Sequence, residues 1–138
     1  MADNEALTPR VFIIRHGETE WAKLGRQTGK TDIHLTPLGL KQVQTTASLL
    51  VGPGKLLDPA KLAHIFVSPR KRALQTLEGL GLGEKGVQVT TTEDMAEWDY
   101  GDYEGMLVME IRKRRRESGL DKEGRVWNVW RDGCEGGE

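Results

Sequence analysis

VFIIRHGET, residues 11–19, is the stretch of this sequence that decides the fold. Its four apolar residues, Val11 to Ile14, predict a buried parallel strand, because strands covered on both faces read as continuous apolar runs. Arg15 and His16 then stand at the carboxyl end of that strand, which is where open α/β sheets bind ligands. A guanidinium binds phosphoryl oxygens with a planar fork of donors, and a neutral imidazole is a nucleophile near pH 7. The pattern indicates phosphate chemistry, and the plainer alternative is a strand that ends in an ordinary hydrogen-bonded histidine.

Helix and strand signals alternate along the rest of the chain. Thr36-Pro37 predicts the start of an amphipathic helix, because a threonine cap followed by proline favours the first helical turn. Ser68-Pro69 repeats this device after a short apolar run and predicts a second helix. The expected strands are 11–14, 65–67 and 87–90, of which the last is the most exposed. The expected helices run from Pro37 to the Gly52-Pro53-Gly54 turn, from Pro69 through Leu77, and from Met106 to Ser118. Loops are expected at 20–34 and 93–105. The pattern predicts one α/β domain over residues 1–138.

Two further side chains are candidates for the same chemistry. Phosphoryl transfer to a histidine needs cations around the equatorial oxygens and an acid that protonates the departing oxygen. Arg72 is expected on the first turn of the second helix, where a solvated helix residue is an equally good reading when it is taken alone. Glu97 lies between Ala96 and Trp98, and apolar neighbours raise a carboxyl pKa toward that of a general acid. His16 is thus the candidate nucleophile, Arg15 and Arg72 the clamp, and Glu97 the acid.

Four motifs in this order resemble the histidine phosphatase superfamily, also called phosphoglycerate mutase-like. They are Arg15 to Thr19; Thr28-Gly29 with Asp32 and Leu35-Thr36; Ser68 to Thr76; and Glu97 with Tyr100-Gly101 and Glu104-Gly105. The resemblance implies a three-layer sandwich with a mostly parallel sheet, phosphorylation of His16, and a phosphate pocket made by Arg15 and Arg72. It also implies that Glu97 donates a proton and then acts as base. The implied substrate-binding residues are Thr19, Thr28, Gly29 and Tyr100.

Within the superfamily, residues 97–105 and the later pieces Asp121-Lys122, Trp127-Asn128 and 130–135 look like the fungal sedoheptulose-1,7-bisphosphatase group. That resemblance implies hydrolysis of the 1-phosphate of a sugar bisphosphate, in the supply of ribose 5-phosphate. Glycolytic mutases carry a lysine soon after their Tyr-Gly to hold a carboxylate, and Val108 falls at about that place here. Mutase-type phosphoryl transfer is one alternative function, and an inactive module that binds a phosphosugar or a protein is another.

The sequence departs from the superfamily pattern at its carboxyl end. Relatives carry a second catalytic histidine in a late His-Gly motif on a central strand, and this chain has no histidine after His64. We therefore expect a C-terminally truncated form with an incomplete sheet. Such a chain is expected to have marginal stability and little activity, because losing a central strand uncovers its neighbours.

Composition limits the partners. Lysine and arginine number 20 and aspartate and glutamate 21, and this net charge of -1 argues against nucleic acid or membrane binding. Cys134 is the single cysteine, so neither an intrachain disulfide nor a cysteine-based zinc cluster can form. We expect no metal and no cofactor, a phosphorylated small molecule as partner, and a cytoplasmic location; the oligomeric state cannot be read. The basic run Arg112 to Arg116 has three interpretations: a solvated helix face, which we favour, a nuclear localisation signal, or a contact with the second phosphate of a bisphosphate.

Overall fold

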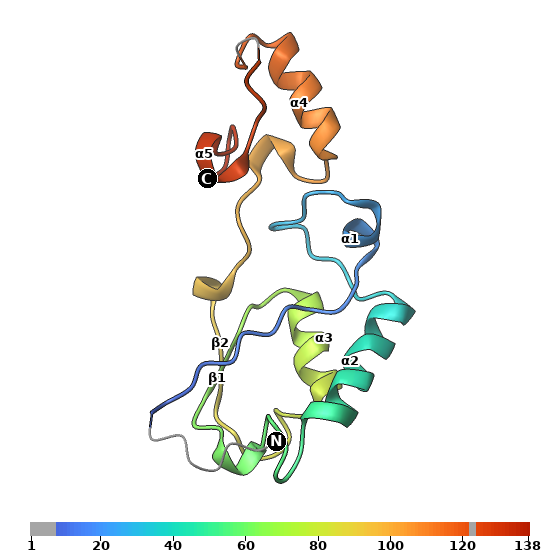
Figure 1. Cartoon of the computed structure of the whole chain (residues 1–138), viewed down its shortest axis with the longest axis vertical. Coiled ribbons are helices and arrows are strands. Elements are labelled where there is room, and N and C mark those ends of the chain that lie inside the picture. Colours follow the sequence, from blue (N-terminus) through green and yellow to red (C-terminus); the bar gives the residue numbers. More distant parts are fainter. Residues whose placement is uncertain (1–7, 122–123) are drawn as a thin grey trace. The chain divides into compact units, whose positions relative to one another are not determined.

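The structure is a computed structural model that describes residues 8–121 and 124–138. In chain order, its elements are α1 (Glu20–Leu24), α2 (Pro37–Leu50), η1 (Pro59–Lys61), β1 (Ile65–Val67), α3 (Lys71–Leu80), β2 (Val89–Thr91), η2 (Glu93–Met95), η3 (Gly101–Tyr103), α4 (Val108–Glu117) and α5 (Val129–Asp132) (Figure 1). They fall into two compact units, each described by itself below. The first holds the described residues up to Thr19 together with Ile33–Met95, and the second holds Glu20–Asp32 and Ala96–Glu138. A single domain over 1–138 stays a prediction.

The first unit is built on the helix pair α2 and α3 and a two-stranded parallel sheet (Figure 1). Helix α2 begins as expected, since the Thr36 hydroxyl accepts a hydrogen bond from the Gly39 N–H at 3.0 Å. Strand β1 pairs in parallel with β2, with Ile65 opposite Val89, and α3 lies between them in the chain. Side chains buried at the core of this unit are Leu35, Val43, Val51, Leu57, Leu80 and Leu82.

The prediction of a strand at 11–14 is wrong, because no strand among the described residues pairs with this segment. This segment lies outside every assigned strand, and Val11 and Ile13 are 86% and 92% exposed. An apolar run favours a strand, but the strand forms only where neighbouring strands supply backbone partners. The observed sheet is consequently smaller than the three-layer sandwich expected from the resemblance, while its parallel pairing is confirmed.

Three other elements differ from expectation. Residues 20–24 form the short helix α1 within the expected loop. Helix α3 begins at Lys71 rather than at Pro69, and the Ser68 hydroxyl accepts a hydrogen bond from the Arg70 N–H at 3.4 Å instead of capping the helix. The exposed strand expected at 87–90 is present as β2, two residues later.

The second unit packs α4 and α5 around an aromatic cluster. Tyr103 and Ile111 are fully buried, and the Trp127 ring meets the Tyr103 ring edge-on with centroids 5.6 Å apart. Trp127 is therefore part of the core of this unit. Trp130 is instead 81% exposed and meets Trp98 edge-on. Among the described residues, no helix is both long and apolar enough to cross a membrane.

Candidate active site

The imidazole of His16 is held in one tautomer by the next residue. Its Nδ1 lies 2.7 Å from the Gly17 carbonyl oxygen. A carbonyl oxygen can only accept, so Nδ1 carries the hydrogen in this contact. In the neutral ring the lone pair then resides on Nε2, and attack on phosphorus requires such a nitrogen lone pair. The ring is half-buried, so it is neither sealed in the core nor fully solvated.

The residues after His16 are fastened to the start of α2. The Glu18 carbonyl accepts from the Thr36 N–H at 2.9 Å, and the Thr36 hydroxyl donates to the Glu18 carboxylate at 2.8 Å. Glu18 in turn donates its N–H to the Gln42 side chain at 3.1 Å. The backbones approach closely here, because a Cβ added to Gly39 would lie 2.2 Å from the Glu18 carbonyl oxygen. Glycine at this position is therefore required by packing.

Helix α3 carries Arg72 on its first turn, as expected. Arg72 is 2% exposed, which excludes the reading of a solvated helix residue. One turn later, the buried Thr76 hydroxyl accepts the Gly17 N–H at 3.2 Å and donates to the Arg72 carbonyl at 2.7 Å. These bonds bring the loop after His16 onto the helix that bears Arg72. Arg15 is exposed, and Thr19 is fully buried and bridges to Leu35 in the same unit.

The other four candidates, Thr28, Gly29, Glu97 and Tyr100, belong to the second unit. Gly29 and Tyr100 are brought together there, since a Cβ on Gly29 would lie 3.1 Å from the Tyr100 ring and 2.2 Å from the Trp98 carbonyl oxygen. The Thr28 hydroxyl donates to the Arg26 carbonyl at 3.2 Å, within the same turn.

Glu104 holds the loop that contains Gly29. Its carboxylate accepts the Gly29 N–H at 2.9 Å and the Thr31 N–H at 3.0 Å. Beside this loop, Lys30 forms an ion pair with Asp99. The hydrogen bond from Lys30, together with the Gly101 N–H, holds the pKa of the Asp99 carboxyl below its usual value.

Glu97 does not have the apolar enclosure expected from its neighbours in the sequence. Its side chain is exposed, and its carboxylate accepts a weak hydrogen bond from the Trp98 N–H at 3.4 Å. Met95 and Ala96 are exposed as well. Neighbours in an extended segment point in different directions, so apolar neighbours along the chain do not by themselves build a pocket.

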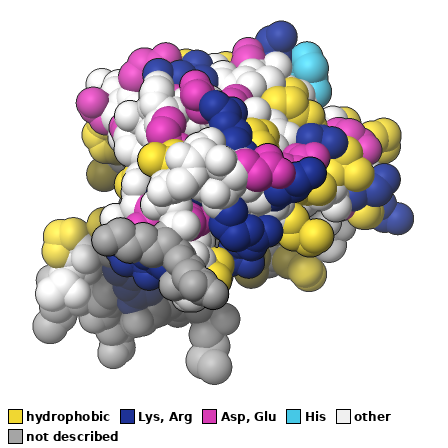
Figure 2. Space-filling view, turned by 90° about the horizontal axis from the view of Figure 1, so that it is seen from above, with side chains coloured by type: hydrophobic (Ala, Val, Ile, Leu, Met, Phe, Trp, Pro, Cys, Tyr) yellow, Lys and Arg dark blue, Asp and Glu magenta, His cyan; other side chains and the backbone are white. Residues whose placement is uncertain are grey.

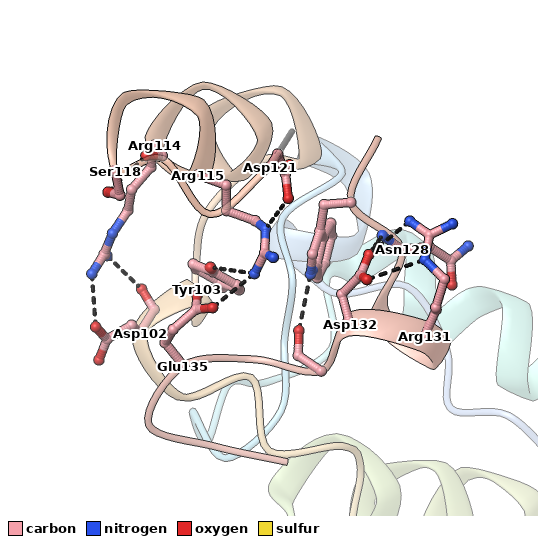
Figure 3. A network of polar contacts seen from close by, with 12 residues as sticks. Asp102, Tyr103, Arg114, Arg115, Ser118, Asp121, Asn128, Arg131, Asp132 and Glu135 are labelled. Carbon is pink, nitrogen blue, oxygen red and sulfur yellow. Dashed lines mark hydrogen bonds and ion pairs between the residues drawn. The ribbon is translucent and has the colours of Figure 1, made fainter. Parts of the chain in front are cut away.

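The basic run 112–116 is not simply a solvated helix face. Arg115 is buried and donates to Asp121 and Glu135, both at 2.7 Å, and to the Tyr103 hydroxyl at 3.1 Å (Figure 3). Arg114 pairs with the more exposed Asp102 at 2.7 Å. Lys113 forms a longer, exposed ion pair with Glu117 at 3.9 Å, so three of these five cations have a partner within the described part of the chain and only Arg115 among those three is buried. Lys122, part of the resemblance noted above, lies outside the described residues.

The same polar network continues to α5. Asp132 accepts hydrogen bonds from Arg131 at 2.8 Å and from the Asn128 N–H at 2.9 Å (Figure 3). These contacts and the nearby Arg125 hold the pKa of the Asp132 carboxyl far below its usual range. On the face drawn in Figure 2, cationic and anionic side chains are interspersed. Burial raises the pKa of the Cys134 thiol, which suits packing better than thiolate chemistry.

Sequence reasoning missed two residues that organise the candidate site. Thr76 and Glu104 both stood in quoted motifs but had no assigned role. The four-residue spacing of Arg72 and Thr76, which places both on one helical face, was the one signal that could have drawn attention to Thr76. Among the described residues, no group of three or more His, Cys, Asp and Glu side chains is placed to hold a metal ion.

Comparisons with known proteins now add to this geometry. The family model for the histidine phosphatase superfamily (branch 1) matches residues 11–138. Sedoheptulose 1,7-bisphosphatase of Saccharomyces cerevisiae is 49% identical over 138 residues, covering 96% of this chain and 51% of that protein. An acid phosphatase of Mycobacterium tuberculosis is 40% identical over 129 residues, covering 94% of this chain and 55% of that protein.

Solved structures agree with the sequence matches. An open reading frame product of Mycobacterium tuberculosis, solved and functionally characterised, superposes with a TM-score of 0.66 at 38% identity and covers 89% of this chain and 54% of that one. The α-ribazole phosphatase of Shigella flexneri gives a TM-score of 0.67 at 25% identity, covering 91% and 56%. The chain spans about half the length of the curated relatives it matches. With its family model matched from Val11 to the last residue, this chain belongs to the histidine phosphatase superfamily.

Proposed function

We propose that this chain takes part in the hydrolysis of phosphomonoesters through a phosphohistidine at His16, with the slow turnover by these 138 residues that the sequence leads us to expect. The observation that carries the proposal is the hydrogen bond from the His16 ring to the Gly17 carbonyl, which places the lone pair of the neutral ring on Nε2. Histidine phosphatases act on phosphorylated substrates, and this chain belongs to that superfamily. A half-buried ring in a fixed tautomer suits in-line attack on phosphorus.

The reaction has two balanced steps. In the first, the Nε2–P bond forms as the P–O bond to the organic group breaks, and Glu97 gives its proton to the departing oxygen. In the second, Glu97 takes a proton from water, whose oxygen attacks phosphorus. The P–N bond breaks and inorganic phosphate leaves. In this proposal Arg15 and Arg72 hold the equatorial oxygens. Thr28, Gly29 and Tyr100 are proposed as substrate contacts because the resemblance implies them, and Thr19, which is fully buried, is left out of this set.

For the substrate, we propose a sugar bisphosphate of the sedoheptulose 1,7-bisphosphate type. The support is the 49% identity to a sedoheptulose 1,7-bisphosphatase. Val108 adds to it, since an apolar side chain offers nothing to the carboxylate of a phosphoglycerate. Comparing phosphate release from sugar bisphosphates with interconversion of phosphoglycerates separates this proposal from mutase-type transfer. Calorimetric binding of sugar bisphosphate without turnover would instead identify a binding module.

The central test is covalent labelling. The chain is incubated briefly with substrate radiolabelled at the 1-phosphate, and the protein-bound label is tested for stability in acid and base. We expect a label that acid removes and base preserves, and we expect His16→Ala to abolish it. His34→Ala is the matched control, because His34 is exposed and stands outside the motifs. A parent chain without label, or a His16→Ala variant that keeps it, contradicts the proposal.

A further inference from the structure

Thr76 occupies a buried position between the two groups that phosphoryl transfer needs. Its side chain is 6% exposed, and its hydroxyl lies between the backbone after the nucleophile and the helix turn that carries Arg72. A hydroxyl has one hydrogen to donate and two lone pairs to accept. Here the hydrogen goes to the Arg72 carbonyl at 2.7 Å, and a lone pair receives the Gly17 N–H at 3.2 Å. Both contacts are satisfied at once by a single oxygen.

Gly17 connects Thr76 to the imidazole of His16. Its N–H is fixed by Thr76, and its carbonyl fixes Nδ1 of His16. The side of Gly17 is also closed, because an added Cβ would lie 2.6 Å from the Gly39 carbonyl oxygen and 3.0 Å from the Val43 side chain. The residue that sets the His16 tautomer is therefore held from both helices of the first unit.

We infer that Thr76 is a positioning residue that fixes the His16 ring relative to the first turn of α3. This role rests on the proposed function, since it matters for catalysis only if His16 is phosphorylated. Without the hydroxyl, the buried Gly17 N–H has no acceptor, and an unsatisfied buried donor costs more than a hydrogen bond gains. The loop must then shift to find another partner, and the ring that Gly17 orients shifts with it.

The test compares Thr76→Val, which removes the hydroxyl at nearly constant shape, with Thr76→Ser, which keeps it. Thr45→Val is the matched control. Thr45 makes the same bond to the carbonyl four residues earlier, at 2.9 Å on α2, but it is exposed and accepts no N–H from the loops that the structure describes. The readouts are the rate of phosphohistidine formation at saturating substrate, hydrogen exchange of the Gly17 amide, and the ¹⁵N shifts of the His16 ring nitrogens.

For Thr76→Val we expect labelling slowed by ~10-fold or more, Gly17 exchange accelerated by a similar factor, and altered His16 ring shifts, as loss of one buried hydrogen bond implies. The Ser variant and the Thr45 control are expected to stay within about threefold of the parent, since each keeps that bond. Unchanged labelling and unchanged ring shifts in Thr76→Val would overturn the inference. If Thr76→Val does not fold, Thr76→Ser and Thr76→Ala form the deciding pair. If the parent chain is not labelled, the proposed function fails, while Gly17 exchange and the ring shifts still decide the role of Thr76.

Discussion

Two adjacent arginines on α4 should differ sharply in their effect on stability. Arg115 and Asp121 are almost closed to solvent, with side chains 8% and 1% exposed. Arg114 and Asp102 form a similar pair at the same 2.7 Å separation, but their side chains are 47% and 52% exposed (Figure 3). Replacing each arginine by methionine keeps most of the aliphatic stem and removes the charge. The main difference between the two pairs is their burial, although Arg115 also bonds to Glu135 and Tyr103.

The magnitudes follow from solvation. Arg115→Met leaves the Asp121 carboxylate buried without its partner, which costs about 3–5 kcal/mol for pairs of this kind. The same change also removes a donor from Glu135 and from the Tyr103 hydroxyl. Arg114→Met removes an exposed pair worth about 0–1 kcal/mol, because water and salt screen it. The Arg114 guanidinium also lies 5.7 Å from the centre of the Tyr103 ring, an interaction that adds roughly 0.5–1 kcal/mol.

Urea unfolding followed by far-ultraviolet circular dichroism and by tryptophan fluorescence measures both variants on the 138-residue chain. The double variant Arg115→Met with Asp121→Asn removes both charges and is expected to recover part of the loss. Equal midpoints for Arg114→Met and Arg115→Met, with unchanged slopes, would refute the reasoning. If Arg115→Met does not fold while Arg114→Met does, the ordering stands.

Two further perturbations test the packing of α2 and the charges of α5. Gly39→Ala gains about 1 kcal/mol of helix propensity, yet its Cβ would lie 2.2 Å from the Glu18 carbonyl oxygen, so we expect the free energy of unfolding to fall by about 1–3 kcal/mol. Gly83→Ala is the control, because its added Cβ meets nothing within 4 Å. A Gly39→Ala variant as stable as the parent chain would contradict this expectation. Asp132 has a folded-state pKa below its unfolded value of about 3.9, so its stabilising contribution is present above that pH and is lost as the pH falls further. Urea midpoints between pH 7 and pH 2 should therefore fall less steeply for Asp132→Asn than for the parent chain, and identical acid limbs would count against this assignment.

The helices could be predicted because their signals are local. Thr36-Pro37 starts α2 through a cap that closes within three residues, and the spacing of Val43 and Ala47 places both on the core side. Gly119, with a φ of 69°, ends the helix expected from Met106, which runs from Val108 to Glu117. Each signal needs only residues within one or two turns, so tertiary context has little chance to override it.

The strand at 11–14 could not be settled in the same way. A run of apolar residues favours burial, but a strand also needs hydrogen-bond partners for its backbone N–H and C=O groups. Those partners come from distant parts of the chain. Residues 65–67 met this condition because Ile65 to Val67 align with Val89 to Thr91. Residues 11–14 did not meet it within the described residues, and their apolar side chains stay exposed.

In the candidate site, too, local sequence signals could be interpreted and long-range contacts could not. His16 and Arg72 could be proposed because short motifs contain the residue types that phosphate chemistry needs, and the burial of Arg72 excludes a solvated helix residue. Thr76 and Glu104 act through hydrogen bonds to Gly17 and Gly29, which are 59 and 75 residues away in the chain. A single sequence contains no record of such pairings, so their roles emerge only from the folded chain.

The contacts around the loop after His16 have one property in common that explains how the candidate nucleophile is held. The backbone N–H groups of Gly17, Glu18 and Leu35 are not bonded to a sheet ladder; each is accepted by a side-chain oxygen from α2 or α3. The three acceptors are Thr76 at 3.2 Å, Gln42 at 3.1 Å and Gln75 at 2.9 Å. A ladder can be formed by almost any sequence, whereas these bonds require particular side chains at particular helix positions. The loop after His16 thus depends on the polar faces of two helices. α2 and α3 can order this loop although residues 11–14 before it pair with no strand in the described part of the chain.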